Sequence, residues 1–524
     1  MKNLILDGKS LNLKKIYNFA HGEPGVQQIA VIKKQSIDRI KSSHKYVASI
    51  AARNTPVYGI NTGFGLLSDV KIPKDRLGEL QVNLLRSHAC GVGNPLSAPE
   101  AKAALLLRAN TLAKGYSGVS PELLQKLIAL INSPVVPWIP EQGSVGASGD
   151  LAPLAHMALL LIGEGKAYLG GRLVSGKDAL KKIGIKPHTL KPKEGLALIN
   201  GTQIMTAIGC LTLFEAQRLA KIADIAGALS LEATRGTAKA FHPMVHKVRP
   251  HREQSIVAGN MRKLLANSTI GKSHKDCERV QDPYSFRCIP QVHGASRRIM
   301  DNCVSILETE ANSATDNPLV FLPSDLSGRG NGLLGGEIVS GGNFHGEYIA
   351  MALDTLAISL AELANISDLR TQKLINPSMS GLPAFLATDP GVNSGMMIVQ
   401  VAAASLVSEN KILCHPASVD SIPTSADKED HVSMGVTAAR KARQVLINST
   451  RVIAMELLCA AQGLDFLRPL KPGKGALAAY DCIRAHVSFA KVDRAFHEDI
   501  EMVEQLVRSG TLLSAVETEI GELS

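Results

Sequence analysis

The chain has 524 residues, 45% of them hydrophobic and 20% charged, which is typical of a soluble globular protein large enough for more than one domain. Its 57 Lys and Arg residues exceed its 47 Asp and Glu residues. The basic side chains are scattered and aromatic residues make up only 4%, which argues against a nucleic-acid surface. The sequence has no apolar run that crosses a membrane, no signal peptide and no CxxC pair. We therefore expect a cytoplasmic protein with reduced thiols and with neither membrane nor nucleic acid as a partner.

The first part of the chain, residues 1–110, mixes short strand-like and helical segments. A helix is predicted over residues 37–54, ending before Pro56. Residues 58–65, YGINTGFG, are too rich in glycine for a regular element and predict a loop that carries one tyrosine. Such a loop is either a structural crossing or a lid over a site. We expect a smaller mixed N-terminal domain here, followed by a helical domain over residues 111–524.

The rest of the chain is strongly helical. Ser120 and Pro121 form an N-cap and first turn before an apolar face that continues to Ile131. Long, Ala-rich or periodic stretches follow at residues 204–234, 349–366, 399–413 and 436–462. Long helices of this kind pack side by side, so the sequence predicts a mainly α protein built as a long-helix bundle.

Two short patterns that suggest ligand binding lack essential residues. Residues 266–273, ANSTIGKS, are similar to a phosphate-binding loop, but Ala266 stands in place of its first glycine. His242 and His246 are four residues apart, but Pro243 follows the first and no glutamate stands between them as a zinc-binding HExxH helix requires. We expect no metal and no external cofactor.

The stretch Gly143–His156 contains the tripeptide Ala147–Ser148–Gly149. The amide nitrogen of Gly149, unhindered by a side chain, can attack the carbonyl carbon of Ala147 and close a five-membered ring. Loss of water and dehydration of Ser148 then give 4-methylidene-imidazol-5-one (MIO), an electrophile that no ordinary side chain provides. Taken alone, such a turn is more often a glycine-rich helix cap. The residues that follow predict an apolar helix over 151–165 with Asp150 as its N-cap.

Seven segments in order resemble the aromatic amino acid ammonia-lyases and, within that family, its histidine-specific members. They are Tyr58–Gly65, Asn83–Gly93, Gly143–His156, Leu198–Gln203, Val280–Ala295, Gly341–Glu347 and Ser421–Met434. The resemblance implies the long-helix bundle of the histidase and fumarase–aspartase type. It also implies a homotetramer in which each active site is assembled from three subunits.

The resemblance also implies an activity and a set of site residues. The reaction would be the non-oxidative deamination of L-histidine to trans-urocanate and ammonia, with MIO formed from the chain as the only prosthetic group. The implied catalytic residues are Ala147, Ser148, Gly149, Tyr58, which would take the β-proton, and Tyr284, which would lie near the electrophile. The implied substrate-binding residues are His88, Asn200, Gln281, Arg287, Phe344 and Glu429. Because an ordinary tyrosine has a pKa near 10, Tyr58 needs nearby positive charge or donors to act as a base at neutral pH.

Substrate choice is expected to depend on His88 and Glu429. A carboxylate can pair with an imidazole N–H, and a buried glutamate opposite a phenyl ring would lack a partner. The alternatives are a tyrosine or phenylalanine ammonia-lyase, an aminomutase, and, more remotely, an inactive helical scaffold protein. The chain departs from the family pattern at Asp427 and Lys428, at His293 where methionine is expected, and at Gly346 and Tyr348.

Overall fold

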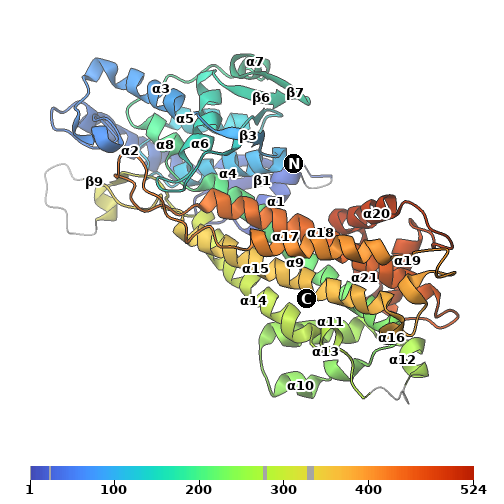
Figure 1. Ribbon diagram of the computed structural model, residues 1–524. Helices are drawn as coiled ribbons and strands as arrows, with labels where there is room; N and C mark the ends of the chain where they lie inside the picture. The colour runs from blue at the N-terminus through green and yellow to red at the C-terminus, as the bar shows by residue number, and fades with distance from the viewer. Residues whose placement is uncertain (1, 23–24, 27, 275–279, 327–335) are drawn as a thin grey trace. The chain divides into compact units, whose positions relative to one another are not determined.

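The computed structural model describes residues 2–22, 25–26, 28–274, 280–326 and 336–524 (Figure 1). These residues form two compact units. Unit 1 comprises residues 1–214, 303–354 and 416–440, and unit 2 comprises residues 215–302, 355–415 and 441–524. Residue 110, near which the sequence predicted a domain boundary, lies in unit 1 within α4 (Ala98–Ala113). That division of the chain into domains stays a prediction.

Unit 1 contains the described strands, arranged in small sheets. β1 (Lys2–Leu6) pairs in parallel with β2 (Gln28–Ile32), and the other ladders are antiparallel. The remaining strands are β3 (Val92–Pro95), β4 (Val136–Pro137), β5 (Pro140–Gln142), β6 (Lys166–Leu169), β7 (Arg172–Ser175), β8 (Leu319–Phe321) and β9 (Glu337–Val339). The shorter α-helices of unit 1, besides α4, are α1 (Leu13–His21), α2 (Lys34–Ala51), α3 (Leu77–His88), α5 (Pro121–Ile131), α6 (Leu151–Leu159), α7 (Gly176–Lys182) and α8 (Glu194–Ile199).

Four long helices contribute residues to both units, as their bounds show: α9 (Gln203–Ala233), α14 (Ile289–Ala311), α15 (Glu347–Ile375) and α18 (Gly435–Asp465). The other α-helices of unit 2 are α10 (Pro243–Lys247), α11 (Arg252–Leu264), α12 (Thr269–Ser273), α13 (Tyr284–Arg287), α16 (Pro377–Ser380), α17 (Met397–Leu413), α19 (Lys474–Arg484), α20 (Phe496–Ser509) and α21 (Thr511–Ile520). The predicted long helices and the mainly α fold are confirmed. The Ser120 side chain caps α5 as predicted, by accepting a hydrogen bond from the Leu123 N–H.

A fully buried polar network joins the long helices within unit 2. Arg370 of α15 pairs with Glu456 of α18 through Nε to Oε1 at 2.5 Å and Nη2 to Oε2 at 2.8 Å. His293 of α14 lies between Asp224 of α9, 2.7 Å from its Nδ1, and Arg370, 3.4 Å from its Nε2. Since Asp224 accepts and Arg370 donates, His293 is neutral with its proton on Nδ1. The network fixes the four helices by directional bonds in an otherwise apolar interior.

Two of these helices, α15 and α18, are long and apolar enough to cross a membrane by length and composition alone. Most of the apolar stretch of each is buried inside the protein. The core helices of soluble proteins have the same properties, so the two helices are weak evidence for a membrane span.

The network predicts acid sensitivity. Burial is the main cause that holds the pKa of His293 below its ordinary value, against the opposing charge of Asp224. Below pH 6.5, His293 is therefore protonated in the unfolded chain but stays neutral in the folded protein until a lower pH. The stabilising contribution is present above the unfolded pKa of about 6.5 and is lost as pH falls below it. We predict that the melting temperature falls between pH 7.5 and pH 5.5, and that His293→Gln makes this fall smaller.

The His293→Gln variant is informative because glutamine can still donate to Asp224 and accept from Arg370 but cannot titrate in this range. Thermal unfolding followed by circular dichroism across the pH range measures the effect. The exposed His497, which pairs with Glu501 within α20, supplies the control variant His497→Gln. Equal pH slopes for the wild type and His293→Gln would contradict the prediction.

Candidate active site

The turn that contains Ala147, Ser148 and Gly149 precedes α6 and is fixed by Asp150, which is fully buried. Asp150 is the N-cap residue of α6, as the sequence predicted, but its side chain makes no capping bond to that helix. Instead, Oδ2 of Asp150 accepts hydrogen bonds from the backbone N–H groups of Ile204 and Met205, at 2.8 and 3.0 Å. These are among the free N–H groups at the beginning of α9, where a carboxylate is favoured. The carboxylate therefore ties the turn to the longer helix.

Burial raises the pKa of Asp150 to about 7, although the N–H groups of Met205 and Ile204 act in the opposite direction. The hydroxyl of Ser144 adds a further hydrogen bond to Oδ1 at 3.2 Å. The two oxygens of one buried carboxylate thus hold both sides of the glycine-rich turn.

Gly149 occupies a position that only glycine fills. Its φ is +71°, in the left-handed region, and it forms a parallel bridge with Gly201. A Cβ added to Gly149 would lie 2.2 Å from the carbonyl oxygen of Gly201, which is backbone and cannot move aside cheaply. The next amide, that of Asp150, donates to the same Gly201 oxygen at 2.7 Å. The turn therefore packs closely against the segment that leads into α9.

Ser148 is held at both its hydroxyl and its carbonyl group. Its Oγ donates to Oε1 of Glu429 at 2.8 Å, and its carbonyl oxygen accepts from Nδ2 of Asn200 at 3.1 Å. Asn200 is only 4% exposed, and its Oδ1 is buried with no hydrogen-bond partner among the described residues. Thr424 donates to the other oxygen of Glu429 at 3.0 Å, which fixes the direction of that carboxylate.

The loop that carries Tyr58 is anchored to the core of unit 1. Ile60 is completely buried, in a cluster with Val47, Ile50 and Val320. Asn61 closes the loop, because its side chain accepts from the Val57 N–H at 2.7 Å and donates to the Thr55 carbonyl at 3.0 Å. These contacts make the loop a fixed crossing at its base.

The surroundings of Tyr58 within unit 1 do not make it a base. Burial raises the pKa of its phenol, and the negative charges of Glu429 and Asp316 raise it further, while a backbone hydrogen bond at Gly65 acts in the opposite direction. The expectation from the sequence was that Tyr58 needs positive charge or donors. The charged groups that act on the Tyr58 pKa, Glu429 and Asp316, carry the opposite sign.

Tyr58, Ala147, Ser148, Phe344 and Glu429 line one cavity of about 810 Å³. Its other lining residues are Pro56, Thr62, Gly65, Ser68, Asp69, Asn317, Ser340, Gly341, Gly342, His345, Lys428, Asp430 and His431. All of them belong to unit 1, and the volume suits a small molecule.

His88, at the C-terminal end of α3, also belongs to unit 1 but is not part of the cavity lining. Burial lowers the pKa of His88, while a hydrogen bond to the Leu84 backbone and the negative charge of Glu429 act in the opposite direction. A neutral imidazole is therefore favoured at this position.

Gln281, Tyr284 and Arg287 belong to unit 2, and none of them lines this cavity. Gln281 and Tyr284 are exposed, and the Arg287 guanidinium lies 4.5 Å from the centre of the Tyr284 ring. The Arg287 Nε is buried, and no residue in the described part of the chain bonds to it. The sequence analysis grouped these residues with Ser148, whereas the described cavity is lined by residues of unit 1.

Sequence reasoning missed several residues that line the cavity or hold its lining residues. Thr424, which orients Glu429, gives no signal of its own in the sequence. His345 and His431 also face the cavity, but they lie in segments 86 residues apart, so no spacing rule connects them.

Comparison with known proteins agrees with this geometry. A family model described as aromatic amino acid lyase matches residues 11–485. A histidine ammonia-lyase of Myxococcus xanthus (strain DK1622) is 53% identical over 513 residues, covering 98% of each chain. One of Alkaliphilus oremlandii (strain OhILAs) is 49% identical and covers 99% of each chain.

Solved structures match over the full chain. A histidine ammonia-lyase from Trypanosoma cruzi has a TM-score of 0.89 at 44% identity and covers 100% of this chain and 96% of that one. A tyrosine aminomutase from Streptomyces globisporus has a TM-score of 0.91 at 38% identity and covers 100% of both chains. The chain thus belongs to the aromatic amino acid lyase family, whose members with these names are carbon–nitrogen lyases or their aminomutase relatives.

Proposed function

We propose that the chain is a histidine ammonia-lyase that converts L-histidine to trans-urocanate and ammonia. The observation that carries the proposal is the direct contact between Ser148 Oγ and the Glu429 carboxylate in one cavity. It puts the serine of an Ala-Ser-Gly turn beside an acceptor suited to an imidazole N–H. The curated relatives at about 50% identity named histidine ammonia-lyase support the same substrate.

The residues present fit the prosthetic group MIO. Gly149 lacks room for a side chain, has a positive φ and forms a bridge with Gly201. Asn200 donates to the Ser148 carbonyl oxygen, on which negative charge develops when such a ring accepts electrons. Ala147–Ser148–Gly149 would form the group, and Asn200 and Phe344 would hold it. When formed, it supplies the electrophile that makes an amino group a better leaving group.

The chain's own side chains would do the remaining work. The imidazole N–H of the substrate would donate to Glu429, whose direction Thr424 fixes. Tyr58, on its anchored loop, would hold the position from which the β-proton is removed. For that role its phenol must lose its proton, and a guanidinium close to it would lower its pKa. We assign two roles to Arg287, whose buried Nε has no partner among the described residues. Its guanidinium would lower the pKa of Tyr58 and would bind the substrate carboxylate.

We further propose that Gln281, Tyr284 and Arg287 reach the site from neighbouring copies of the chain in a homotetramer. Exposed apolar side chains support this assembly. α15 and α17 present the exposed residues Ile358, Leu369, Ile398, Val401 and Ile412 within unit 2. Such a surface is expected to be covered by another copy. We place the enzyme in the cytoplasm, in line with its scattered charges and lack of CxxC pairs.

A tyrosine-specific lyase or aminomutase is the second candidate. The match to the Streptomyces globisporus tyrosine aminomutase, at 38% identity, favours it. Glu429 argues against a phenylalanine substrate, whose ring has no donor for this carboxylate. A tyrosine phenol can donate to it, so histidine is favoured over tyrosine by the relatives at 49–53% identity that are named histidine ammonia-lyase.

Formation of the electrophile has a direct test in the intact mass of the purified chain. We expect the wild type to weigh two water molecules less than its sequence, and Ser148→Ala and Gly149→Ala to keep the full mass. The alanine at 149 would meet the Gly201 carbonyl oxygen and block the turn. Circular dichroism establishes that each variant folds. A folded wild type with an unmodified mass would overturn the lyase mechanism.

Substrate choice is tested by Glu429→Gln. We expect kcat/KM for L-histidine to fall about 10- to 150-fold, because a hydrogen bond to a charged group contributes roughly 1.5–3 kcal/mol. Turnover of L-phenylalanine, whose ring has no hydrogen-bond donor, should not fall with it. Glu337→Gln, an exposed change in β9, is the control. The intact mass of the variant separates weaker binding from failure to form the electrophile. A loss that is equal for both substrates would contradict the assignment.

Sharing of the site between subunits is tested by complementation. Ser148→Ala and Tyr284→Phe chains, each inactive alone, are co-expressed with different affinity tags and purified through both tags. If one chain supplies Ser148 and another supplies Tyr284, random assembly restores about a quarter of the sites. A doubly tagged sample of the double variant Ser148→Ala/Tyr284→Phe gives the baseline. Recovery no greater than this baseline would mean that each site is built from one chain.

A further inference from the structure

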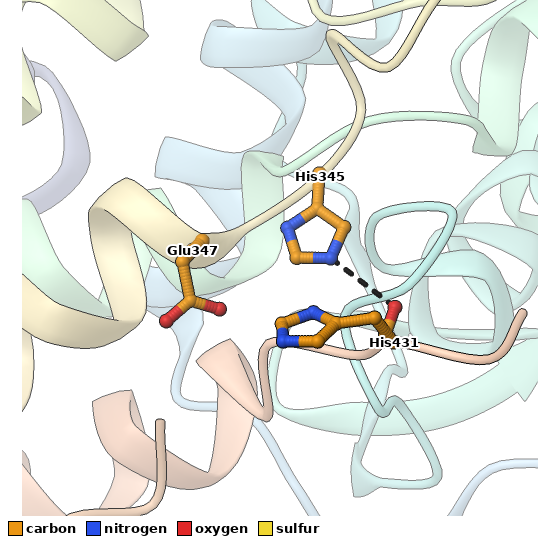
Figure 2. Close-up of side chains that lie close together, drawn as sticks. All are labelled: His345, Glu347 and His431. Carbon is orange, nitrogen blue, oxygen red and sulfur yellow. Dashed lines mark hydrogen bonds between the residues drawn. The ribbon is translucent and has the colours of Figure 1, made fainter. Parts of the chain in front are cut away.

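His345, Glu347 and His431 form a cluster of metal-ligating side chains beside the cavity, all within unit 1 (Figure 2). Their potential ligand atoms lie within 4.8 Å of one another. His345 and Glu347 flank the beginning of α15, and His431 comes from the loop that contains Glu429. The sequence analysis expected no metal and considered only the pair His242 and His246. His345 and His431 are 86 residues apart, so no spacing pattern connects them.

The hydrogen bonding of His345 leaves one ring nitrogen available. Its Nε2 lies 3.2 Å from the carbonyl oxygen of His431, which can only accept, so the proton is on Nε2. The lone pair of Nδ1 is then free to bind a cation. A histidine that donates its other N–H to a backbone carbonyl is the usual arrangement of a metal ligand, because the bond fixes the ring and its tautomer.

Glu347 supplies a second, independent sign of a ligand. Its Oε2 is buried and has no hydrogen-bond partner among the residues that the structure describes. A buried carboxylate oxygen without a donor is costly. Figure 2 shows the carboxylate of Glu347 to the left of the imidazole rings of His345 and His431. The centres of these two rings are 5.5 Å apart. A cation between them would satisfy this oxygen.

We propose that His345, Glu347 and His431 bind one divalent transition-metal ion, with Zn²⁺ as the preferred occupant. Two imidazoles and one carboxylate are a common zinc ligand set that leaves a fourth position open. Ligand atoms around tetrahedral zinc are about 3.4 Å apart, so the cluster has to contract by roughly 1 Å. His431 is exposed, and a rotation of its side chain can supply this movement.

The bound ion would join the segment before α15 to the loop that orients Glu429. His431 is two residues from Glu429, and that loop contains Ser425, Ala426 and Asp427 in the left-handed region, with φ of +53°, +53° and +62°. The conformation of this loop is unfavourable for its own backbone, and an ion bound to His431 would reduce the motion of the loop. The expected signature is slower amide exchange in residues 424–431 when the metal is present.

The test is isothermal titration of the full, chelator-treated chain with Zn²⁺ alone. We expect one ion per chain in the wild type and at least a tenfold weaker affinity in Glu347→Gln and in His431→Asn. Hydrogen exchange of residues 424–431 with and without Zn²⁺ is measured on the same samples. Because His431 is exposed, its variant tests the site even if Glu347→Gln folds poorly.

His497→Asn is the matched control, because it removes a surface His–Glu pair in α20 outside the cluster. It should bind Zn²⁺ as the wild type does. Absence of stoichiometric binding in the wild type, or binding that survives both cluster variants, would overturn the proposal. The readout requires no turnover, and Ser148→Ala should bind the ion equally well, so failure here is distinguishable from failure of the proposed lyase function.

Discussion

The contact between the buried Asp150 carboxylate and the first N–H groups of α9 is the interaction on which the site depends. It costs the protein the burial of an acidic group, whose pKa rises to about 7. In return it joins the Ala147–Ser148–Gly149 turn to a helix of 31 residues. With both ends of the turn fixed, the backbone cannot relax away from Gly201. The chemistry proposed for the tripeptide needs such enforced proximity, because an amide nitrogen is a weak nucleophile.

Positioning on the other side of the cavity depends on a less favourable piece of backbone. The loop before Glu429 has three successive residues with positive φ, none of them glycine, and each such residue costs on the order of 1 kcal/mol or more. Thr424 and Glu429 pair across it through both of their backbone groups, at 2.9 and 3.2 Å. The carboxylate is therefore held by a local bridge, whereas Ser148 is held by the helical core. A cavity between a rigid wall and a strained loop can adjust to a small ligand on one side only.

The sequence predicted the helices well because their signals are local. Ser120 and Pro121 mark the beginning of α5, and the periodic stretches correspond to α9, α15, α17 and α18. It also singled out Ser148, Asn200 and Glu429, although only the structure joins them by hydrogen bonds.

The failures concern partners that are distant in sequence. Asp150 is the N-cap residue of the helix that follows it, but its carboxylate bonds to Ser144 and to two N–H groups more than fifty residues further on. No pattern announced that His293, Arg370 and Glu456 meet in the interior, nor that acidic residues surround Tyr58. Propensity and spacing describe what a segment does by itself, whereas pairing of buried charges is decided by the packing of whole helices.

The hydrogen bond between Ser148 and Glu429 exists only while the serine keeps its hydroxyl group. In this state the Ser148 hydroxyl occupies the carboxylate of Glu429, the group that we propose binds the substrate. If the hydroxyl left as water, Thr424 would still donate to Oε2 of Glu429, but Oε1 would lose the donor that Ser148 provides. The dehydration that forms the electrophile would therefore also free Glu429 to bind a ligand. An immature chain would neither react nor compete for the substrate of its mature neighbours.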